Sequence, residues 1–580
     1  MTPDTFEAHV RDGHSFEGQT LSELDLRGRS LVGAKLQGVR LVRFNFEGAD
    51  LSGAAFDRVS MVACNLKFTR LAGAKFHGTQ LLSCDLCEAD LQAATFVQSV
   101  FGGACDLTKV NLGGAELTET ALARTKLPEA VFSRSKLRQV ALVECSLVGA
   151  DFAGAHIEHS ALSGADLTRA RFTGTELSSV MMSDAVLCEA DFSGASVHQG
   201  MFTRADLRRA RLPKKISASA FDGARFESVD LSSAQLSMSS LSDVDLAGAH
   251  FEEATITSCT FRASRIPNGK FAGATIEGSD FSDCVFEGAD FEGARLQRST
   301  FSGAKFGGVD LSGQVFELLS FDGADFSGCK LVAARFDLTT LRGATFTGAD
   351  LSRARLNAVV LADANLEGAV LAGSIFERVV LDGVQIKGIK FEGLIMRRCK
   401  FSEADFSGVQ LRRCDLTGSE FGGANLTRAK FTDCTLAMTN FKGANLEGSS
   451  FAGAKMKGSF FGEAILRGAN FEKAFLRFST FTKADLERTI FKGANLRETM
   501  LDDVNATGAF FTAANLAYAD LSNSNATDAD FGEADLSHAL LHNLKVNGAS
   551  WQGANRLTAR GTDLDRLEAE AYRPPRPKNA

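Results

Sequence analysis

The chain has 580 residues, 44% of them hydrophobic and 23% charged, and its formal net charge is −8 at neutral pH. This charge is mild for the length, and no stretch approaches the roughly eighteen consecutive apolar residues of a membrane helix, so we expect no membrane span. Length alone would suggest several domains, but a repeat that runs through most of the chain predicts one solenoid.

The first fifteen residues predict a short helix that caps the repeat. Thr2 is suited to the N-cap, Pro3 to the first helical position, and Gly13 to the end of the helix. Phe6 and Val10 lie four residues apart and would share one helix face. The same stretch lacks the apolar core of a signal peptide, so we expect a cytoplasmic location.

From Phe16 to Trp551 a large apolar residue recurs at every fifth position. In "ANLEGSSFAGAKMKG" these central residues are Leu446, Phe451 and Met456, and a small residue lies two places before each. A spacing of five would spiral around a helix and would alternate between the two faces of one strand. The chain must therefore turn before each new centre, with the centre and the small residue inward and the other three positions facing water.

Two register breaks interrupt the period. One residue is inserted within 102–106, so the centre moves from Phe101 to Leu107, and one is lost within 213–215, after which Ile216 resumes the first register. Counting along the sequence gives 108 centres, and all but Ala506 and Ala526 are large and apolar. We expect these two alanines to leave a thin core unless Phe510 or Tyr518 turns inward.

The repeat has the form A(D/N)LxG, as in "ADLSG", "ANLEG" and "ADFSG". With this motif the chain resembles the pentapeptide-repeat protein family over residues 16–551. The resemblance implies an all-β fold, a right-handed quadrilateral parallel β-helix with five residues per side and twenty per coil. At four centres per coil, 108 centres predict about 27 coils. Phenylalanines that recur at intervals of twenty, such as Phe421, Phe441 and Phe461, favour four sides.

Residues 552–580 follow the last coil. Leu564, Leu567 and Ala571 have helical spacing, which predicts a second capping helix. The final residues, "RPPRPKNA", predict a disordered basic tail.

The sequence predicts neither an enzyme nor a cofactor. Ten of the twelve cysteines take the small inward position, where we expect buried thiols in a reducing cytoplasm, and only Cys87 and Cys188 fall outside it. His156, His159 and His198 could approach one another as metal ligands, but solvated histidines are the more ordinary interpretation. No phosphate loop, dinucleotide fingerprint or nucleophile elbow is present.

Apolar residues at outward positions are the first candidates for a partner surface. Local packing of β-branched and aromatic residues in strands is the alternative, and the sequence leaves both open. The candidate partner-binding residues are Val360, Val370, Ile375, Val380, Ile395, Phe460, Phe475, Phe478, Ile490 and Phe510.

Basic residues gather in two regions, one at the second register break and one after residue 386. The simplest interpretation is that these residues belong to an ordinary solvated surface. The alternative is that they bind an acidic partner; we do not expect that partner to be a nucleic acid. The candidate basic patch comprises Arg208, Arg209, Lys214, Lys215, Arg397, Arg398, Arg412 and Arg413.

Two functional hypotheses follow. The first is a non-enzymatic bacterial scaffold, a rigid rod that binds unidentified protein partners or a second copy of itself. Some long pentapeptide-repeat proteins resemble accessory parts of secretion systems such as type VI, so this chain could be such an accessory part.

The second hypothesis is a DNA mimic that acts on DNA gyrase, as small members of the family do. A mimic needs one continuous acidic wall. One outward column reads Asp230, His250, Lys270, Asp290, Asp310, Lys330, Asp350 and Val370. Its alternating signs favour the scaffold.

Overall fold

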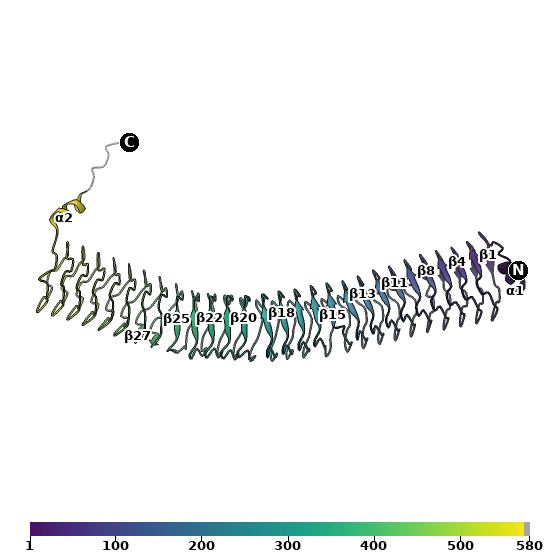
Figure 1. Cartoon of the computed structure of the whole chain (residues 1–580), viewed down its shortest axis with the longest axis horizontal. Helices are drawn as coiled ribbons and strands as arrows, with labels where there is room; N and C mark the ends of the chain where they lie inside the picture. The colour runs from purple at the N-terminus through teal and green to yellow at the C-terminus, as the bar shows by residue number, and fades with distance from the viewer. Residues whose placement is uncertain (573–580) are drawn as a thin grey trace, which may run out of the picture. The chain divides into compact units, whose positions relative to one another are not determined.

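The computed structural model describes residues 1–572, and the chain divides into two compact units, Met1–Phe301 and Ser302–Ala580. In each unit the chain winds into a parallel β-solenoid, with strands of successive coils side by side (Figure 1). The predicted fold class is confirmed, including the two short helices. Within the described part of the chain, neither helix has the length and apolarity that a membrane crossing requires.

Unit 1 contains one helix, α1 (Pro3–Arg11), and nineteen short strands. The strands are β1 (Thr20–Ser22), β2 (Lys35–Gln37), β3 (Arg40–Val42), β4 (Ala55–Asp57), β5 (Ser60–Val62), β6 (Lys75–His77), β7 (Gln80–Leu82), β8 (Thr95–Val97), β9 (Val100–Gly102), β10 (Glu116–Thr118), β11 (Lys136–Arg138), β12 (His156–Glu158), β13 (Glu176–Ser178), β14 (Ser196–His198), β15 (Lys215–Ser217), β16 (Gln235–Ser237), β17 (Thr255–Thr257), β18 (Thr275–Glu277) and β19 (Arg295–Gln297).

Unit 2 contains the remaining strands and the second helix. These are β20 (Val315–Glu317), β21 (Arg335–Asp337), β22 (Arg355–Asn357), β23 (Ile375–Glu377), β24 (Phe391–Glu392), β25 (Ile395–Arg397), β26 (Gln410–Arg412), β27 (Lys430–Thr432) and α2 (Leu564–Ala571).

Strand register shows how each coil stacks on the next. Lys136 of β11 pairs with His156 of β12, twenty residues on, as four sides of five residues require. At the insertion Thr95 pairs with Glu116, and at the deletion Ser196 pairs with Lys215. These spacings of 21 and 19 show that the corners absorb both changes while the strand ladder continues.

The coil count differs from the prediction, since the solenoid has about 21 turns rather than 27. A coil does not need to contain a strand. Among the described residues, no strand follows β27 (Lys430–Thr432), although the chain continues to coil. There, single-residue bridges such as Asn445 with Ile465 join consecutive coils. The sequence period marks a repeat whether or not its side is long enough to form a strand.

The inward centres form stacked columns in the core. Phe441, Phe461 and Phe481 are fully buried, with ring centroids 5.0 and 4.6 Å apart in consecutive coils. Ala506 and Ala526 are buried as well, while Phe510 and Tyr518 face outward and do not fill the space beside them. Ten of the twelve cysteines are buried, and Cys87 and Cys188 are half-buried.

The many outward Asp and Asn residues have a structural role at the turns. The Asp151 carboxylate, for example, accepts a hydrogen bond from the backbone N–H of Ala153, with an N···O distance of 3.0 Å. Such a bond satisfies a backbone donor where the chain turns. Local bonding of this kind gives the repeated Asp and Asn side chains a role in the turns.

The two helices differ in how they meet the coils. In α1, Thr2 caps the N-terminus, and Phe6 is fully buried with its ring centroid 5.4 Å from that of Phe16. Helix α2 has no buried residue, although Glu570 lies 3.2 Å from the nearly buried imidazole of His542. The predicted basic tail, residues 573–580, lies outside the described residues.

Candidate functional site

The four walls of unit 2 are labelled here by their outward residues. Wall A contains Val380 and Lys400, wall B contains Asp405 and Asn425, wall C contains Asp350 and Val370, and wall D contains Ile375 and Ile395. The chain passes along walls A, B, C and D in that order in every coil.

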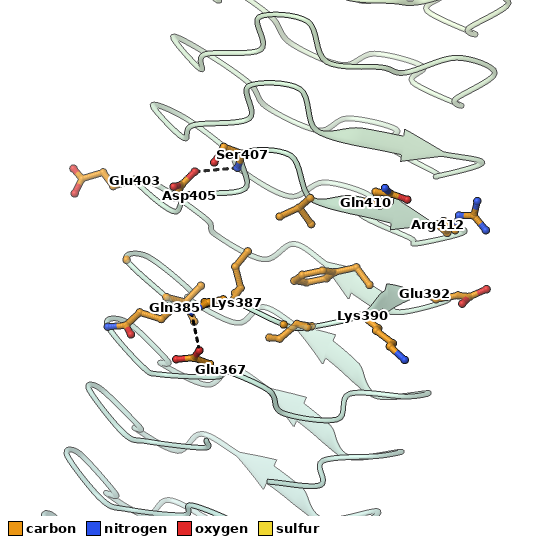
Figure 2. Close-up of a pocket in the computed structure, with 17 residues that line it drawn as sticks. Glu367, Gln385, Lys387, Lys390, Glu392, Glu403, Asp405, Ser407, Gln410 and Arg412 are labelled. Atoms are coloured by element: carbon orange, nitrogen blue, oxygen red, sulfur yellow. Dashed lines mark hydrogen bonds and ion pairs between the residues drawn. The ribbon is translucent and has the colours of Figure 1, made fainter. Parts of the chain in front are cut away.

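A cleft of about 880 Å³ opens between two consecutive coils of unit 2, across walls B and C. Residues 383–392 form one lip, and residues within 403–412 form the other. Figure 2 shows the two stretches parted, with Glu403 and Asp405 at one end and Lys390, Glu392 and Arg412 at the other. The Glu392 carboxylate forms an ion pair with Arg413, so positive charge is in excess at that end, and the opposite end is acidic.

The backbone ladder is interrupted at this cleft. One coil below, the N–H of Leu366 donates to the carbonyl of Gln385 at 2.8 Å, and the N–H of Gln385 donates to Ala364 at 3.0 Å. Within residues 1–572, the equivalent bonds one coil higher, from the N–H groups of Ile386, Gly388 and Asp405, are not formed. Both lips thus expose backbone groups that the rest of the wall pairs.

Overfilling of one coil explains the opening. The four inward positions that are usually small hold Val379, Val384, Ile389 and Leu394 in the coil of the lower lip. Extra methylenes in a close-packed core displace backbone. Ile389 is only half-buried, and so is Val409, which takes the same inward position one coil higher.

Side-chain contacts fix the polar groups around the cleft. The ammonium of Lys387 lies 3.4 Å from the Glu367 carboxylate, which bridges the lower lip to the coil beneath it. The Asp405 carboxylate accepts a hydrogen bond at 2.9 Å from the N–H of Ser407. Among the described residues, Lys390, Arg412 and Glu403 form no ion pair, so these three charges remain available to a ligand.

The first group of candidate apolar residues lies around the cleft on three walls; it comprises Val360, Val370, Ile375, Val380 and Ile395. Val360 and Val380 form a bridge on wall A, and Ile375 pairs with Ile395 on wall D. All four side chains are half-buried. Val370 on wall C is 48% exposed. Lys390, the residue that would cover it one coil higher, belongs to the displaced lip and forms no bridge with it.

The second group of candidate apolar residues does not form one surface; it comprises Phe460, Phe475, Phe478, Ile490 and Phe510, and the outward residue Met500 lies near them. Ile490 and Phe510 bridge on wall C, while Phe460 and Met500 lie on wall A, where each bridges to Thr480. Phe475 lies on wall D, and Phe478 lies at the corner that joins walls D and A. Phe460, Phe475, Phe478 and Met500 therefore gather around one corner, which we call the aromatic corner.

The aromatic corner is exposed and flanked by cations. Phe475 is 55% exposed and Phe478 46%. The guanidinium of Arg477 lies 4.4 Å from the centroid of the Phe478 ring, and the ammonium of Lys457 lies at 5.7 Å. Phe478 also has a φ of +65°, a left-handed conformation that costs most side chains about 1–2 kcal/mol.

Most of the candidate basic residues are neutralised by neighbouring carboxylates. Arg208 lies 2.6 Å from Asp206, and Arg397 lies 2.6 Å from Asp415. The other ion pairs are Arg209 with Glu227, Lys214 with Asp230, Arg398 with Glu377, and Arg413 with Glu392. Among the described residues only Lys215 and Arg412 of the predicted patch have no such partner.

The second register break opens a smaller cleft in unit 1. Its volume is about 600 Å³, and it is lined by residues of 228–232 and 247–252. The centre Phe226 is half-buried there, and the ammonium of Lys214 lies 3.0 Å from the Asp230 carboxylate. Loss of one residue at 213–215 thus loosens the wall beside it.

The three histidines that could have formed a metal site contact other side chains instead. His156, His159 and His198 each contact a different side chain, Glu176, Glu158 and Ser217. No metal-binding group of three or more His, Cys, Asp or Glu residues occurs in residues 1–572.

The outward column that a DNA mimic would need is not continuously acidic. In unit 2, Lys330 stands between Asp310 and Asp350 in this column and lies 3.6 Å from Asp310.

Comparison with known proteins identifies the repeat. Profiles described as pentapeptide repeats (8 copies) match eleven segments between residues 30 and 543, more than half of the chain. A profile of pentapeptide repeats (9 copies) matches 271–313, and a pentapeptide repeat region matches 404–478 and 424–501. No curated protein matches the chain.

Three solved structures illustrate the similarity. QnrB1, a plasmid-mediated fluoroquinolone resistance protein, is 20% identical over 32% of this chain and 92% of its own, with a TM-score of 0.19. A pentapeptide repeat protein from the Arabidopsis thaliana thylakoid lumen is 27% identical over 22% and 74%, with a TM-score of 0.16. HetL of Nostoc sp. strain PCC 7120, involved in heterocyst differentiation regulation, is 20% identical over 68% and 97%, with a TM-score of 0.10.

Sequence reasoning missed the cleft. It placed Val370, Ile395, Arg397 and Arg412 near one another along the chain, but it did not find the opening between them. The available signal was the run of four bulky residues at inward positions in one coil, Val379, Val384, Ile389 and Leu394.

Proposed function

Because this chain belongs to the pentapeptide-repeat family, we propose that it is a non-enzymatic scaffold that binds a protein partner through patches on its walls. The aromatic corner is the observation that carries this proposal. A solenoid buries its centres and leaves its walls to solvent, so the stacking of coils does not require exposed rings there. Aromatic residues beside arginine are typical of residues that dominate protein interfaces.

The position of Phe478 strengthens the argument. Glycine would adopt a φ of +65° without strain, whereas a phenylalanine there adds a conformational cost. Its ring is about half exposed, so burial recovers only part of that cost. Contact with a partner would bury the remaining ring surface, and the Arg477 and Lys457 cations on the ring favour a partner surface that carries carboxylates.

The test is affinity purification of the tagged full-length chain from the organism that encodes it, with quantitative mass spectrometry. We expect at least one protein captured by the native chain to be lost with Phe475→Ser combined with Phe478→Gly. Val380→Lys combined with Ile395→Lys, on walls A and D near the cleft, serves as the comparison pair. If neither pair changes the captured proteins or the oligomeric state, the two apolar groups are packing features and the proposal is wrong.

A gyrase supercoiling assay separates this proposal from the DNA mimic. The mixed charge of the Asp310, Lys330 and Asp350 column predicts no inhibition at low micromolar protein. Inhibition, or rescue from a gyrase-directed drug, would replace the scaffold with the mimic.

A further inference from the structure

We propose that the cleft between residues 383–392 and 403–412 binds an extended peptide segment of another protein, whose backbone pairs with the open β-ladder. The segment carries an acidic side chain at the end that faces Lys390 and Arg412. This site is separate from the aromatic corner, and the inference stands without the partner proposed for that corner.

The exposed backbone groups supply the first argument. The N–H groups of Ile386 and Gly388 lie two residues apart on the lower lip and lack the acceptors that the next coil provides elsewhere. Lys387 and Gly388 lie in a turn, but the equivalent N–H groups one coil below, those of Leu366 and Gly368, donate to carbonyls that are also two residues apart, at Gln385 and Lys387. Unpaired backbone edges of a sheet recruit extended segments. A peptide that supplies carbonyls at alternate residues would therefore replace the missing bonds.

The apolar floor supplies the second argument. Ile389 and Val409 occupy inward positions that are buried elsewhere, yet both remain half-buried at the cleft, beside the buried Phe391. Side chains at every second residue of an extended peptide point toward the same face. Small or medium apolar side chains at these positions would cover Ile389 and Val409, and this favours a peptide of alternating pattern over a compact ligand.

Charge sets the direction and composition of the segment. Figure 2 shows Lys390 and Arg412 at one end of the cleft, both without an ion pair among the described residues, and Glu403 at the other. Glu392 lies across the strands from Arg412, but its carboxylate is paired with Arg413, so the charge that remains at this end is positive. An acidic residue near Lys390 and Arg412 would gain two partners, and it would be repelled at the opposite end. The cleft volume of about 880 Å³ lies within the range of roughly 300–1,000 Å³ that is usual for ligand sites.

The chain's own last residues have the wrong chemistry for this cleft. The segment "RPPRPKNA" contains three prolines, which lack backbone N–H donors, and three cations. It would bring positive charge toward Lys390 and Arg412. A segment of another protein is therefore the occupant that we infer.

The experiment uses the full-length protein and two fluorescein-labelled hexapeptides of alternating valine and serine with blocked ends, in which one glutamate replaces either the first or the last serine. We expect saturable binding by fluorescence anisotropy, and a loss of at least tenfold in affinity with Lys390→Glu combined with Arg412→Glu. The same peptide with lysine in place of its glutamate should bind this charge-reversed protein and not the native one. Lys483→Glu combined with Lys492→Glu, on exposed lysines more than three coils away along the chain, is the matched control and should bind as the native chain does.

Two further measurements test backbone pairing. Methylation of alternate peptide nitrogens should lower affinity at least tenfold, and peptide binding should slow hydrogen exchange at the amides of Ile386 and Gly388. Ile389→Ala, which relieves the overfilled coil, should slow the same exchange without peptide and weaken peptide binding.

Binding that ignores both charge reversal and nitrogen methylation, or no saturation up to millimolar peptide, would overturn the proposal. The pair Phe475→Ser and Phe478→Gly should bind the peptide as the native chain does. A failure of this site and a failure of the aromatic corner can therefore be told apart.

Discussion

Replacement of Phe461 by alanine tests how the stacked core holds neighbouring coils together. The Phe461 ring is fully buried and lies between Phe441 and Phe481, with centroid distances of 5.0 and 4.6 Å. The ring of Phe471 meets it edge-on at 5.6 Å. Removal of a buried phenylalanine side chain costs about 3–5 kcal/mol, because the transfer free energy is lost and a cavity remains. Two of the lost contacts are stacked pairs, which places the expected cost in the upper part of this range.

Hydrogen exchange measured by mass spectrometry is the appropriate assay. Each coil contacts only its neighbours, so the destabilisation should be concentrated in the adjacent coils instead of spreading through both units. A loss of 3–5 kcal/mol corresponds to exchange about 10²- to 4 × 10³-fold faster in peptides that cover residues 441–481. Peptides from unit 1 should exchange as before.

The matched control is Phe478→Ala, which removes the same ring from an exposed corner of the same coils. It should leave exchange at residues 441–481 within a few-fold of the native rate, because the ring is 46% exposed. Equal exchange in the Phe461→Ala chain and the native chain would refute the stacked core. Equal acceleration by the two substitutions would refute its assignment to the inward positions.

Three other outcomes follow from local contacts. Phe478→Gly should leave the denaturation midpoint of unit 2 nearly unchanged. Relief of the left-handed φ of +65°, worth about 1–2 kcal/mol, is offset by the loss of the half-buried ring surface and of an exposed cation–π contact worth about 0.5–1 kcal/mol. A loss of several kcal/mol would contradict this balance. Hydrogen bonds from Arg208 lower the pKa of Asp206 to about 2, so its stabilising contribution is complete above about pH 4 and is lost as the pH falls toward 2. Acid titration of Asp206→Asn should therefore show a shallower loss of stability over that interval, and an unchanged slope would count against the pair. Burial raises the pKa of the Cys284 and Cys399 thiols to about 12, so iodoacetamide at pH 8 should leave both unlabelled in the folded chain and label both after unfolding, as mass spectrometry would show.

The period of five was sufficient to predict a coiled chain, because it fixes which side chains face inward; the right-handed, four-sided form was implied by the resemblance to the repeat family. Leu446, Phe451 and Met456 are all fully buried, and the small residues before them lie inward as well. The number of turns was less accessible. A coil joined by one-residue bridges, such as Asn445 with Ile465, has the same sequence pattern as a coil that contains a strand. Strand length depends on local backbone geometry that the pattern does not encode.

The cleft could not be predicted from outward residues, because its cause lies in the core. Each of Val379, Val384, Ile389 and Leu394 is acceptable at an inward position when its neighbours are small, as Val39 and Val59 show by being buried in unit 1. The opening depends on the summed volume within one coil, a property of four side chains that are separated by fifteen residues in sequence. Inspection of each position by itself therefore missed it.

The exterior of this solenoid is informative where a residue conflicts with the requirements of its coil. A corner position adopts positive φ whatever its side chain, so glycine is the least strained choice there, and most outward positions accept a polar residue. Phe478 adds backbone strain and exposed apolar surface at once, and Ile389 leaves backbone donors without partners. Phe68, Leu338 and Met438 share the positive φ and the exposure of Phe478, but the aromatic corner adds further exposed rings and cations beside it. A contact from outside the chain would bury these rings and pair the open donors of the cleft, which makes both places better candidates for binding than the paired charges that surround them.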